Sequence, residues 1–155
     1  MSDTMILAEQ AASFGYCEKV LSPSYKEGIQ THVPAPGWRA IGRGHSRTCY
    51  LGPDGFVYKV QKRHSYLGNI NLCEWEKYRE ISSQQIPEGF GIPTMELIET
   101  SYGTVIVCEY IDGPHPSPDN ENDYYNVGST LGIHDCGYFN LVVRDNILYF
   151  VDIAA

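Results

Sequence analysis

The stretch "GIHDCGYFNLVVRDNILYFVDIA", residues 132–154, sets two aspartates and one asparagine around a predicted pair of short strands. The strands are expected at "NLVV" and "LYFVDI", with the chain reversing through "RDN". Asp135 and Asn140 form a D-x-x-x-x-N pattern, and Asp152 follows near the end of the second strand. Carboxylate and carboxamide oxygens suit a divalent metal, and a further carboxylate can take a proton from a hydroxyl. Taken singly, each of the three residues is more typical of a turn, a cap or a strand edge than of such a site.

The composition restricts the class of protein. The chain has 155 residues, of which 43% are apolar and 19% charged, as expected of one ordered globular protein. The net charge of −8 and the absence of a lysine or arginine block exclude nucleic acid as an expected partner. The start resembles no signal peptide and no stretch has the roughly 20 apolar residues of a membrane span. The lack of such a span predicts no membrane partner, and five cysteines without a CxxC pair predict reduced thiols and a cytoplasmic location.

The order of predicted elements indicates an α+β protein. A helix is expected at residues 3–21 with Ile6 and Phe14 near one face, followed by a proline- and glycine-rich loop. A short helix is expected at residues 121–131, although Gly128 weakens its pattern. Three strands, a central helix and two further strands lie between them, at 38–44, 47–52, 56–62, 66–83, 94–100 and 103–111. The turn "GPDG" at residues 52–55 is typical of a hairpin.

The central helix carries an acid in an unusual place. At about 100° per residue, Glu74 falls in the middle of an apolar arc that includes Ile70 and Ile81, whereas Glu76 points to the opposite side. A carboxylate on a buried face is costly unless a cation meets it. Lys59 lies in the preceding apolar strand, on the same face as Val57. The pattern therefore predicts that Lys59 pairs with Glu74, although a strand lysine can equally point to solvent.

Two glycines lie between the first two strands of this region. Gly42 and Gly44, in "IGRGHSRTCYL", would let backbone N–H groups approach a phosphate, and Arg43 and Arg47 could neutralise its charge. An ordinary glycine-containing turn with exposed arginines explains the same residues. The ordered set of G-x-G, strand lysine, helix glutamate, D-x-x-x-x-N and aspartate favours the phosphate site.

This ordered set resembles the protein-kinase-like fold, including the compact kinase-like phosphotransferases of bacteria and phages. "IGRGHSRTCYLGPDGFVYKV" is similar to the nucleotide-binding hairpin of the early serine/threonine kinases of short-tailed lytic phages. "DCGYFNLVV" and "YFVDIA" resemble the catalytic loop and metal-binding motif of that group. "VIVCEYIDG" resembles the strand and hinge after the small lobe, with Cys108 at the gatekeeper position.

The resemblance implies a fold, a site and its cofactors. The fold is a minimal protein-kinase-like α+β fold, with a five-stranded antiparallel N-lobe sheet, one helix and a severely truncated C-lobe. The implied domains are an N-terminal helix and loop at 1–37, an N-lobe at 38–111 and a C-lobe at 112–155. ATP and Mg²⁺ are the implied cofactors. Asp135 would be the catalytic base, Asn140 and Asp152 the metal ligands, and the nucleotide would contact Gly42, Gly44, Lys59, Glu74, Glu109 and Ile111.

The sequence also departs from the family. Ile133-His134-Asp135 replaces the usual HRD, Asp152-Ile153-Ala154 replaces DFG, and the segment between Glu109 and Asp135 is much shorter than in ordinary protein kinases. The N-terminal helix or a second copy of the chain, in a homo-oligomer, would have to compensate the missing core.

Three functional hypotheses remain open. The preferred one is an enzyme that phosphorylates a protein hydroxyl, acting on a protein of a phage's host. The second is an inactive kinase-like module that binds and inhibits a host or partner protein through its acidic surface. The third is a phosphotransferase acting on a cationic small molecule.

Overall fold

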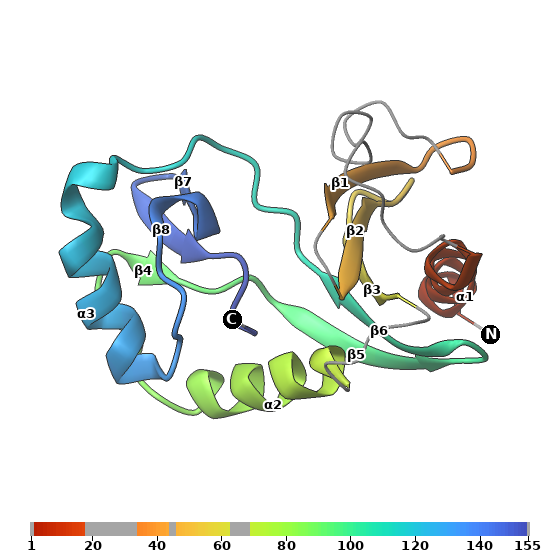
Figure 1. The fold of residues 1–155 in the computed structure, drawn as a ribbon, viewed down its shortest axis with the longest axis horizontal. Coiled ribbons are helices and arrows are strands. Elements are labelled where there is room, and N and C mark those ends of the chain that lie inside the picture. The colour runs from red at the N-terminus through yellow and green to blue at the C-terminus, as the bar shows by residue number, and fades with distance from the viewer. Residues whose placement is uncertain (1, 18–33, 44–45, 63–68, 155) are drawn as a thin grey trace. The chain divides into compact units, whose positions relative to one another are not determined.

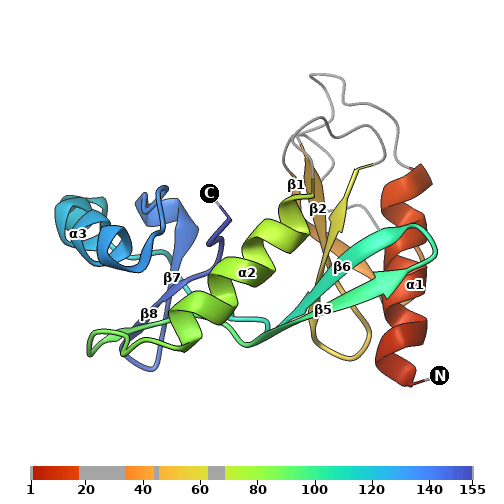
Figure 2. The ribbon, with the colours of Figure 1, turned by 90° about the horizontal axis from the view of Figure 1, so that it is seen from below.

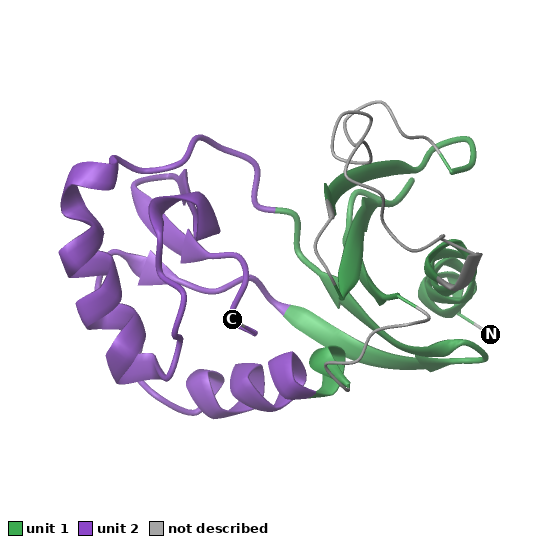
Figure 3. Cartoon of the chain, in the orientation of Figure 1, with its two compact units in different colours: residues 1–72, 95–110 green, residues 73–94, 111–155 purple. Residues whose placement is uncertain are grey.

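The computed structural model describes residues 2–17, 34–43, 46–62 and 69–154 of the chain, whose elements are drawn in Figure 1. The chain forms two compact units. Unit 1 consists of Met1–Leu72 and Met95–Tyr110, and unit 2 of Cys73–Thr94 and Ile111–Ala155 (Figure 3). The predicted domain boundaries near residues 37 and 111 stay a prediction.

Unit 1 is built on a five-stranded antiparallel sheet, as predicted. Its strands are β1 (Arg39–Arg43), β2 (Arg47–Leu51), β3 (Val57–Gln61), β5 (Met95–Thr100) and β6 (Gly103–Cys108). They lie in the order β1-β2-β3-β6-β5 and every neighbouring pair is antiparallel. The sheet thus places β3, with its lysine, at the centre.

The β2–β3 hairpin follows the predicted turn. The Gly52 N–H donates to the Phe56 carbonyl at 2.9 Å, and Asp54 Oδ1 accepts from the Phe56 N–H at 3.2 Å. Gly55 has a φ of +83°, a conformation that favours glycine. The turn residues therefore fix the register in which Lys59 pairs with Cys49.

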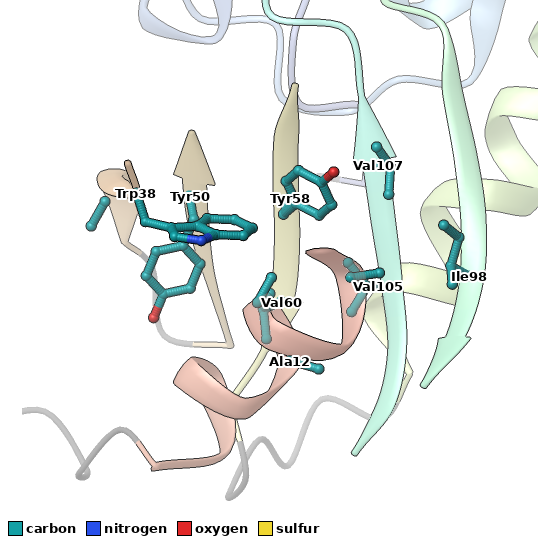
Figure 4. Packing of buried hydrophobic residues seen from close by; sticks show 11 residues of the cluster. Ala12, Trp38, Tyr50, Tyr58, Val60, Ile98, Val105 and Val107 are labelled. Atoms are coloured by element: carbon teal, nitrogen blue, oxygen red, sulfur yellow. The ribbon is translucent and has the colours of Figure 1, made fainter. Parts of the chain in front are cut away.

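Helix α1 (Asp3–Cys17) packs on one face of this sheet (Figure 2). The prediction that Ile6 lies near the packed face is wrong, because Ile6 is 50% exposed and the alanines of the helix are buried instead. Small residues allow close approach: a Cβ on Gly15 would lie 2.2 Å from Val60 Cγ1. The core cluster on this face is shown in Figure 4 and comprises Ala8, Ala11, Ala12, Trp38, Ala40, Tyr50, Tyr58, Val60, Ile98, Val105 and Val107.

Unit 2 contains most of α2, a second helix and a small sheet. The elements are α2 (Ile70–Ser82), β4 (Phe90–Gly91), α3 (Glu121–Leu131), β7 (Leu141–Arg144) and β8 (Ile147–Phe150), with single turns of 3₁₀ helix at Pro118–Asn120 and Tyr138–Asn140. The sheet order is β4-β8-β7, with β4 parallel to β8. The two-residue β4 is too short to produce a periodic pattern, so the sequence did not predict it.

Helix α3 matches its predicted bounds, and Gly128 has a packing role in it. A Cβ at this position would lie 2.0 Å from Cys136 Sγ, so glycine is what allows the helix to approach the loop that carries Asp135. The helix ends at Gly132, which has a φ of +81°. Within the described ranges, no helix has the length and apolar character needed to cross a membrane.

Candidate functional site

Lys59 lies in β3 of unit 1 and is buried, with 4% of its side chain exposed. Alternation along β3 places Tyr58 and Val60 against α1, so Lys59 and Val57 occupy the opposite face of the sheet. This confirms the predicted face of Lys59. A buried lysine needs anionic or hydrogen-bonding surroundings, and Lys59 does have interactions in this structure.

Gly42 lies in the same cross-strand row as Lys59. Gly42 pairs with Cys49, and Cys49 pairs with Lys59 in the next strand. Gly42 is part of β1, within the strand predicted at 38–44, and lies next to a shift in the register of the β1–β2 ladder. Gly44 lies outside the described residues. Cys49, which lies between Gly42 and Lys59, was not singled out from the sequence because an isolated cysteine in a strand carries no motif.

Arg47 contacts a residue that the sequence analysis missed. Its Nη1 donates to Asn71 Oδ1 at 3.1 Å, so its side chain is not simply exposed to solvent. Asn71 is fully buried in the first turn of α2. Asn71 lies three residues before Glu74 on the same helical arc, and this position could have predicted its burial from the sequence.

The predicted hinge follows β6. The strand ends at Cys108, earlier than the predicted end at residue 111, and Glu109 and Ile111 lie in irregular structure. Cys108 is buried and its thiol donates to the Glu109 carbonyl at 3.3 Å. Glu109 belongs to unit 1 and Ile111 to unit 2, and their contacts with adenine stay a prediction.

Glu74, in unit 2, is fully buried, whereas Glu76 is exposed, as the helical arc predicted. Glu74 Oε2 accepts hydrogen bonds from the Ile153 N–H at 3.1 Å and the Ala154 N–H at 3.2 Å. The carboxylate therefore holds the backbone of the motif that follows Asp152. The predicted Lys59–Glu74 pair joins residues of different units and stays a prediction.

Asp135 and Asn140 are linked through the loop between them. Asp135 Oδ1 accepts from the Gly137 N–H at 3.3 Å, and Asn140 Nδ2 donates to the Asp135 carbonyl at 3.3 Å. Among the described residues, no donor lies on Asp135 Oδ2 or on Asn140 Oδ1. One carboxylate oxygen and one carboxamide oxygen thus remain able to accept a proton or a cation.

The β7–β8 hairpin brings Asp152 to the same end of the small sheet as Asn140. Leu141 pairs with Phe150, and the Val151 N–H donates to the Asn140 carbonyl at 3.1 Å. Asp152 is the next residue, and its Oδ1 accepts from the Ala154 N–H at 3.2 Å. Unit 2 thus places the backbones of Asn140 and Val151, the residue before Asp152, side by side, and Asn140 is hydrogen-bonded to the Asp135 carbonyl.

The donor set fits Mg²⁺ bound jointly with phosphate. Within the described part of the chain, no three His, Cys, Asp or Glu side chains form a cluster that could hold a metal by themselves. Mg²⁺ keeps several waters and usually takes one or two carboxylates plus substrate phosphates. One carboxylate from Asp152 and one carboxamide oxygen from Asn140 match that requirement, with the phosphates supplying the remaining oxygens.

Cys136 is the residue next to the predicted base Asp135, but its thiol is unreactive near pH 7. It is fully buried against Gly128, and its thiol lies 3.5 Å from the Ile133 carbonyl. Burial, and to a lesser extent the charge of Asp135, raises the pKa of this thiol to about 11. The thiol is therefore neutral near pH 7 and is not a nucleophile there.

The fold is similar to that of known phosphotransferases. The streptomycin–ATP complex of APH(2'')-IIa matches with a TM-score of 0.50 and 14% identity over 88% of this chain and 73% of that one. ADP-bound aminoglycoside phosphotransferase APH(2'')-Ib matches with a TM-score of 0.39, and the gentamicin complex of APH(2'')-IIa with 0.40. Both are 21% identical, over 66% and 68% of this chain and 33% of their own length.

No model of a protein family matches the sequence, and no curated protein matches it. The likeness is therefore one of fold. The chain has a protein-kinase-like fold, which confirms the predicted α+β fold class.

Proposed function

We propose that this chain is an ATP- and Mg²⁺-dependent phosphotransferase of minimal protein-kinase type, which transfers the γ-phosphate to a protein hydroxyl. The observation that carries the proposal is the arrangement in unit 2, where the Asn140 carbonyl accepts from the N–H of Val151, directly before Asp152, at one end of the β7–β8 hairpin. In the adjoining loop, the Asp135 carbonyl accepts a hydrogen bond from Asn140 Nδ2. A scaffold without chemistry has no physical need for this set.

Each residue has a role that follows from its chemistry. Lys59 neutralises phosphate oxygens, and Gly42 leaves the same face of the sheet open to them. The backbone at Glu109 and Ile111 binds adenine. Asn140 and Asp152 would hold Mg²⁺, which supplies charge neutralisation of the phosphates when bound. Glu74 holds the Ile153 and Ala154 N–H groups and so orients Asp152.

Asp135 acts on the acceptor. Its carboxylate orients the acceptor hydroxyl and takes its proton, while the acceptor oxygen forms a bond to the γ-phosphorus. The bond between that phosphorus and the β-γ bridging oxygen breaks, and ADP leaves. Such catalysis consists mainly of positioning and charge stabilisation, so a small scaffold suffices if it is rigid.

The acceptor that we propose is a protein of a bacterial host, with the chain acting in the host cytoplasm. The resemblance of residues 41–60 and 135–154 to early phage serine/threonine kinases supports this target. The net charge of −8 would favour an acceptor surface that is basic.

A binding module without catalysis is the alternative. It is supported by the short segment between Glu109 and Asp135, which the structure describes throughout and in which α3 is the one α-helix. In that case the acidic surface would bind and inhibit a partner, and nucleotide would be a structural ligand or none. A cationic small molecule is a further candidate acceptor, supported by the charge and by the likeness of fold to aminoglycoside phosphotransferases.

The test begins with ligand-dependent stability. Melting temperature is measured with and without excess ATP and Mg²⁺ for the parent chain and for Asp152→Ala. Ligand at 100 times its dissociation constant stabilises a binding-competent fold by about 2.7 kcal/mol. We expect a metal-dependent shift in the parent that Asp152→Ala loses.

Transfer itself is then measured with γ-labelled ATP against a basic peptide, a host lysate and an aminoglycoside. Label on protein supports the proposal and label on the aminoglycoside alone moves the acceptor to the small-molecule class. Nucleotide binding without any transfer supports the binding module. No shift and no transfer would reject the ATP site.

A further inference from the structure

Asn71 is a buried polar residue at a junction within unit 1. It lies in the first turn of α2, is 0% exposed, and sits beside strands β2, β3 and β6. Its side-chain Nδ2 donates to the Lys59 carbonyl at 3.0 Å and to the Thr104 carbonyl at 2.9 Å. Both donors of the amide are thus used, on the backbones of two adjacent strands.

The orientation of the Asn71 amide is fixed by Arg47. Arg47 Nη1 donates to Asn71 Oδ1 at 3.1 Å. A flipped amide would place its oxygen against two carbonyl oxygens and its NH₂ group against a guanidinium, so only one orientation satisfies every group. A fourth contact, from the Asn71 N–H to Gln61 Oε1 at 2.8 Å, fastens the start of α2 to the end of β3.

The strand position that this amide binds is that of Lys59. Its bond to the Lys59 carbonyl restricts the peptide plane from which the lysine side chain departs. Gln61, which is also bonded to Asn71, lies on the same face of β3 as Lys59 because successive residues alternate. Asn71 therefore binds β3 at two points, the Lys59 carbonyl and the Gln61 side chain.

We propose that Asn71, oriented by Arg47, is the positioning residue that aims Lys59 at the phosphates of the nucleotide. The proposal rests on the proposed role of Lys59 in nucleotide binding. It assigns to Arg47 an indirect part, through Asn71, in place of direct phosphate contact.

The first experiment uses a readout that does not depend on nucleotide. The intact parent, Asn71→Leu and Tyr58→Phe are labelled with a trace of acetic anhydride, and acylation of Lys59 is compared with that of Lys77 by mass spectrometry. Tyr58→Phe is the matched control: it removes a side-chain hydrogen bond, to Asp54 at 2.6 Å, from the neighbouring residue on the opposite face of β3. Both variants should lower the melting temperature.

We expect Asn71→Leu to change the relative acylation of Lys59 by at least about threefold and Tyr58→Phe to leave it unchanged. Equal acylation in the parent and Asn71→Leu overturns the proposal, and so does an equal change in both variants, which would indicate general loosening of the sheet. ATP affinity, measured by calorimetry, should fall about tenfold in Asn71→Leu alone. A parent that binds no ATP rejects the proposed function, while the acylation result still decides the positioning role.

Arg47→Leu separates positioning from phosphate binding, and where Asn71→Leu does not fold, a change of Lys59 acylation in Arg47→Leu relative to the parent tests the proposal by itself. A positioning role predicts a smaller change of Lys59 acylation in the same direction. It also predicts that the double variant loses no more ATP affinity than Asn71→Leu alone, because Arg47 and Asn71 act through the same hydrogen bond. If Arg47→Leu weakens ATP binding additively and leaves Lys59 acylation unchanged, Arg47 is a phosphate ligand and its assigned part is wrong.

Discussion

Glu74 Oε2 lies 3.1 Å from the backbone nitrogen of Ile153, and the adjacent Ala154 N–H donates to the same oxygen. A buried carboxylate in α2 thus holds the backbone directly after Asp152. Carboxylate acceptors form stronger hydrogen bonds than neutral ones, and here two N–H groups converge on one oxygen. This contact offsets part of the cost of burying Glu74, and it connects the helix to the proposed metal ligand.

Replacing Glu74 should therefore destabilise unit 2. Glu74→Ala leaves the Ile153 N–H without its acceptor, which costs about 1–3 kcal/mol for a buried donor, and leaves the Ala154 N–H with Asp152 Oδ1 as its acceptor. Chemical denaturation measures the loss. Glu76→Ala, two residues along α2 on the exposed side, is the control and should be nearly silent; equal losses for the two variants would contradict this role of Glu74.

Asp135→Asn should abolish phosphoryl transfer and spare both folding and ATP affinity. Asparagine keeps an oxygen for the Gly137 N–H, which Asp135 Oδ1 now accepts, but it cannot take a proton from a hydroxyl. Transfer of labelled phosphate and calorimetric ATP binding test the two halves of this statement. A variant that unfolds would make Asp135 a structural residue.

Lys59→Ala should weaken ATP binding, because it removes a cation from the face of the sheet that carries Gly42. The melting temperature of the ligand-free variant, measured beside its ATP affinity, separates binding from stability. Lys62→Ala, at a lysine just beyond β3, is the control for loss of one positive charge. Unchanged ATP affinity in Lys59→Ala would remove Lys59 from the site.

Gly128→Ala should destabilise the protein although alanine is the better helix former. The new Cβ would lie 2.0 Å from Cys136 Sγ, and overpacking of this kind costs about 1–3 kcal/mol. Thermal unfolding measures the loss, with the exposed Ser129→Ala as the control. Adding Cys136→Ala should recover part of the stability; if it does not, the clash with the thiol is not the cause.

The Cys136 thiol should resist alkylation in the folded chain, whereas the exposed Cys73 should react readily. Burial raises the pKa of Cys136 to about 11 from the ordinary thiol value of 9.0, so the folded state favours the protonated form. This contribution to stability is complete below pH 9 and is lost as the pH rises toward 11. Alkylation followed by mass spectrometry, and unfolding between pH 8 and pH 11 compared with Cys136→Ala, check both statements.

The sequence by itself determined the five-stranded sheet, the hairpin turn at Gly52–Gly55 and the buried face of α2 with Glu74 in it. These features depend on local patterns: alternation along a strand, turn chemistry and the period of a helix. The sequence also determined that Asn140 and Asp152 lie at the two ends of one short hairpin, because such a hairpin brings its own two ends together.

Only the tertiary structure decided which groups meet across long stretches of chain. It made Glu74 the acceptor for the Ile153 and Ala154 N–H groups. It placed Asn71 between Arg47 and the Lys59 carbonyl. It packed Cys136 against Gly128, where a side chain would clash. It also buried the small alanines of α1 in preference to Ile6. Periodicity shows which face of an element is buried but not what lies opposite it, since a hydrogen-bond partner or a close approach depends on the packing of elements that are distant in sequence.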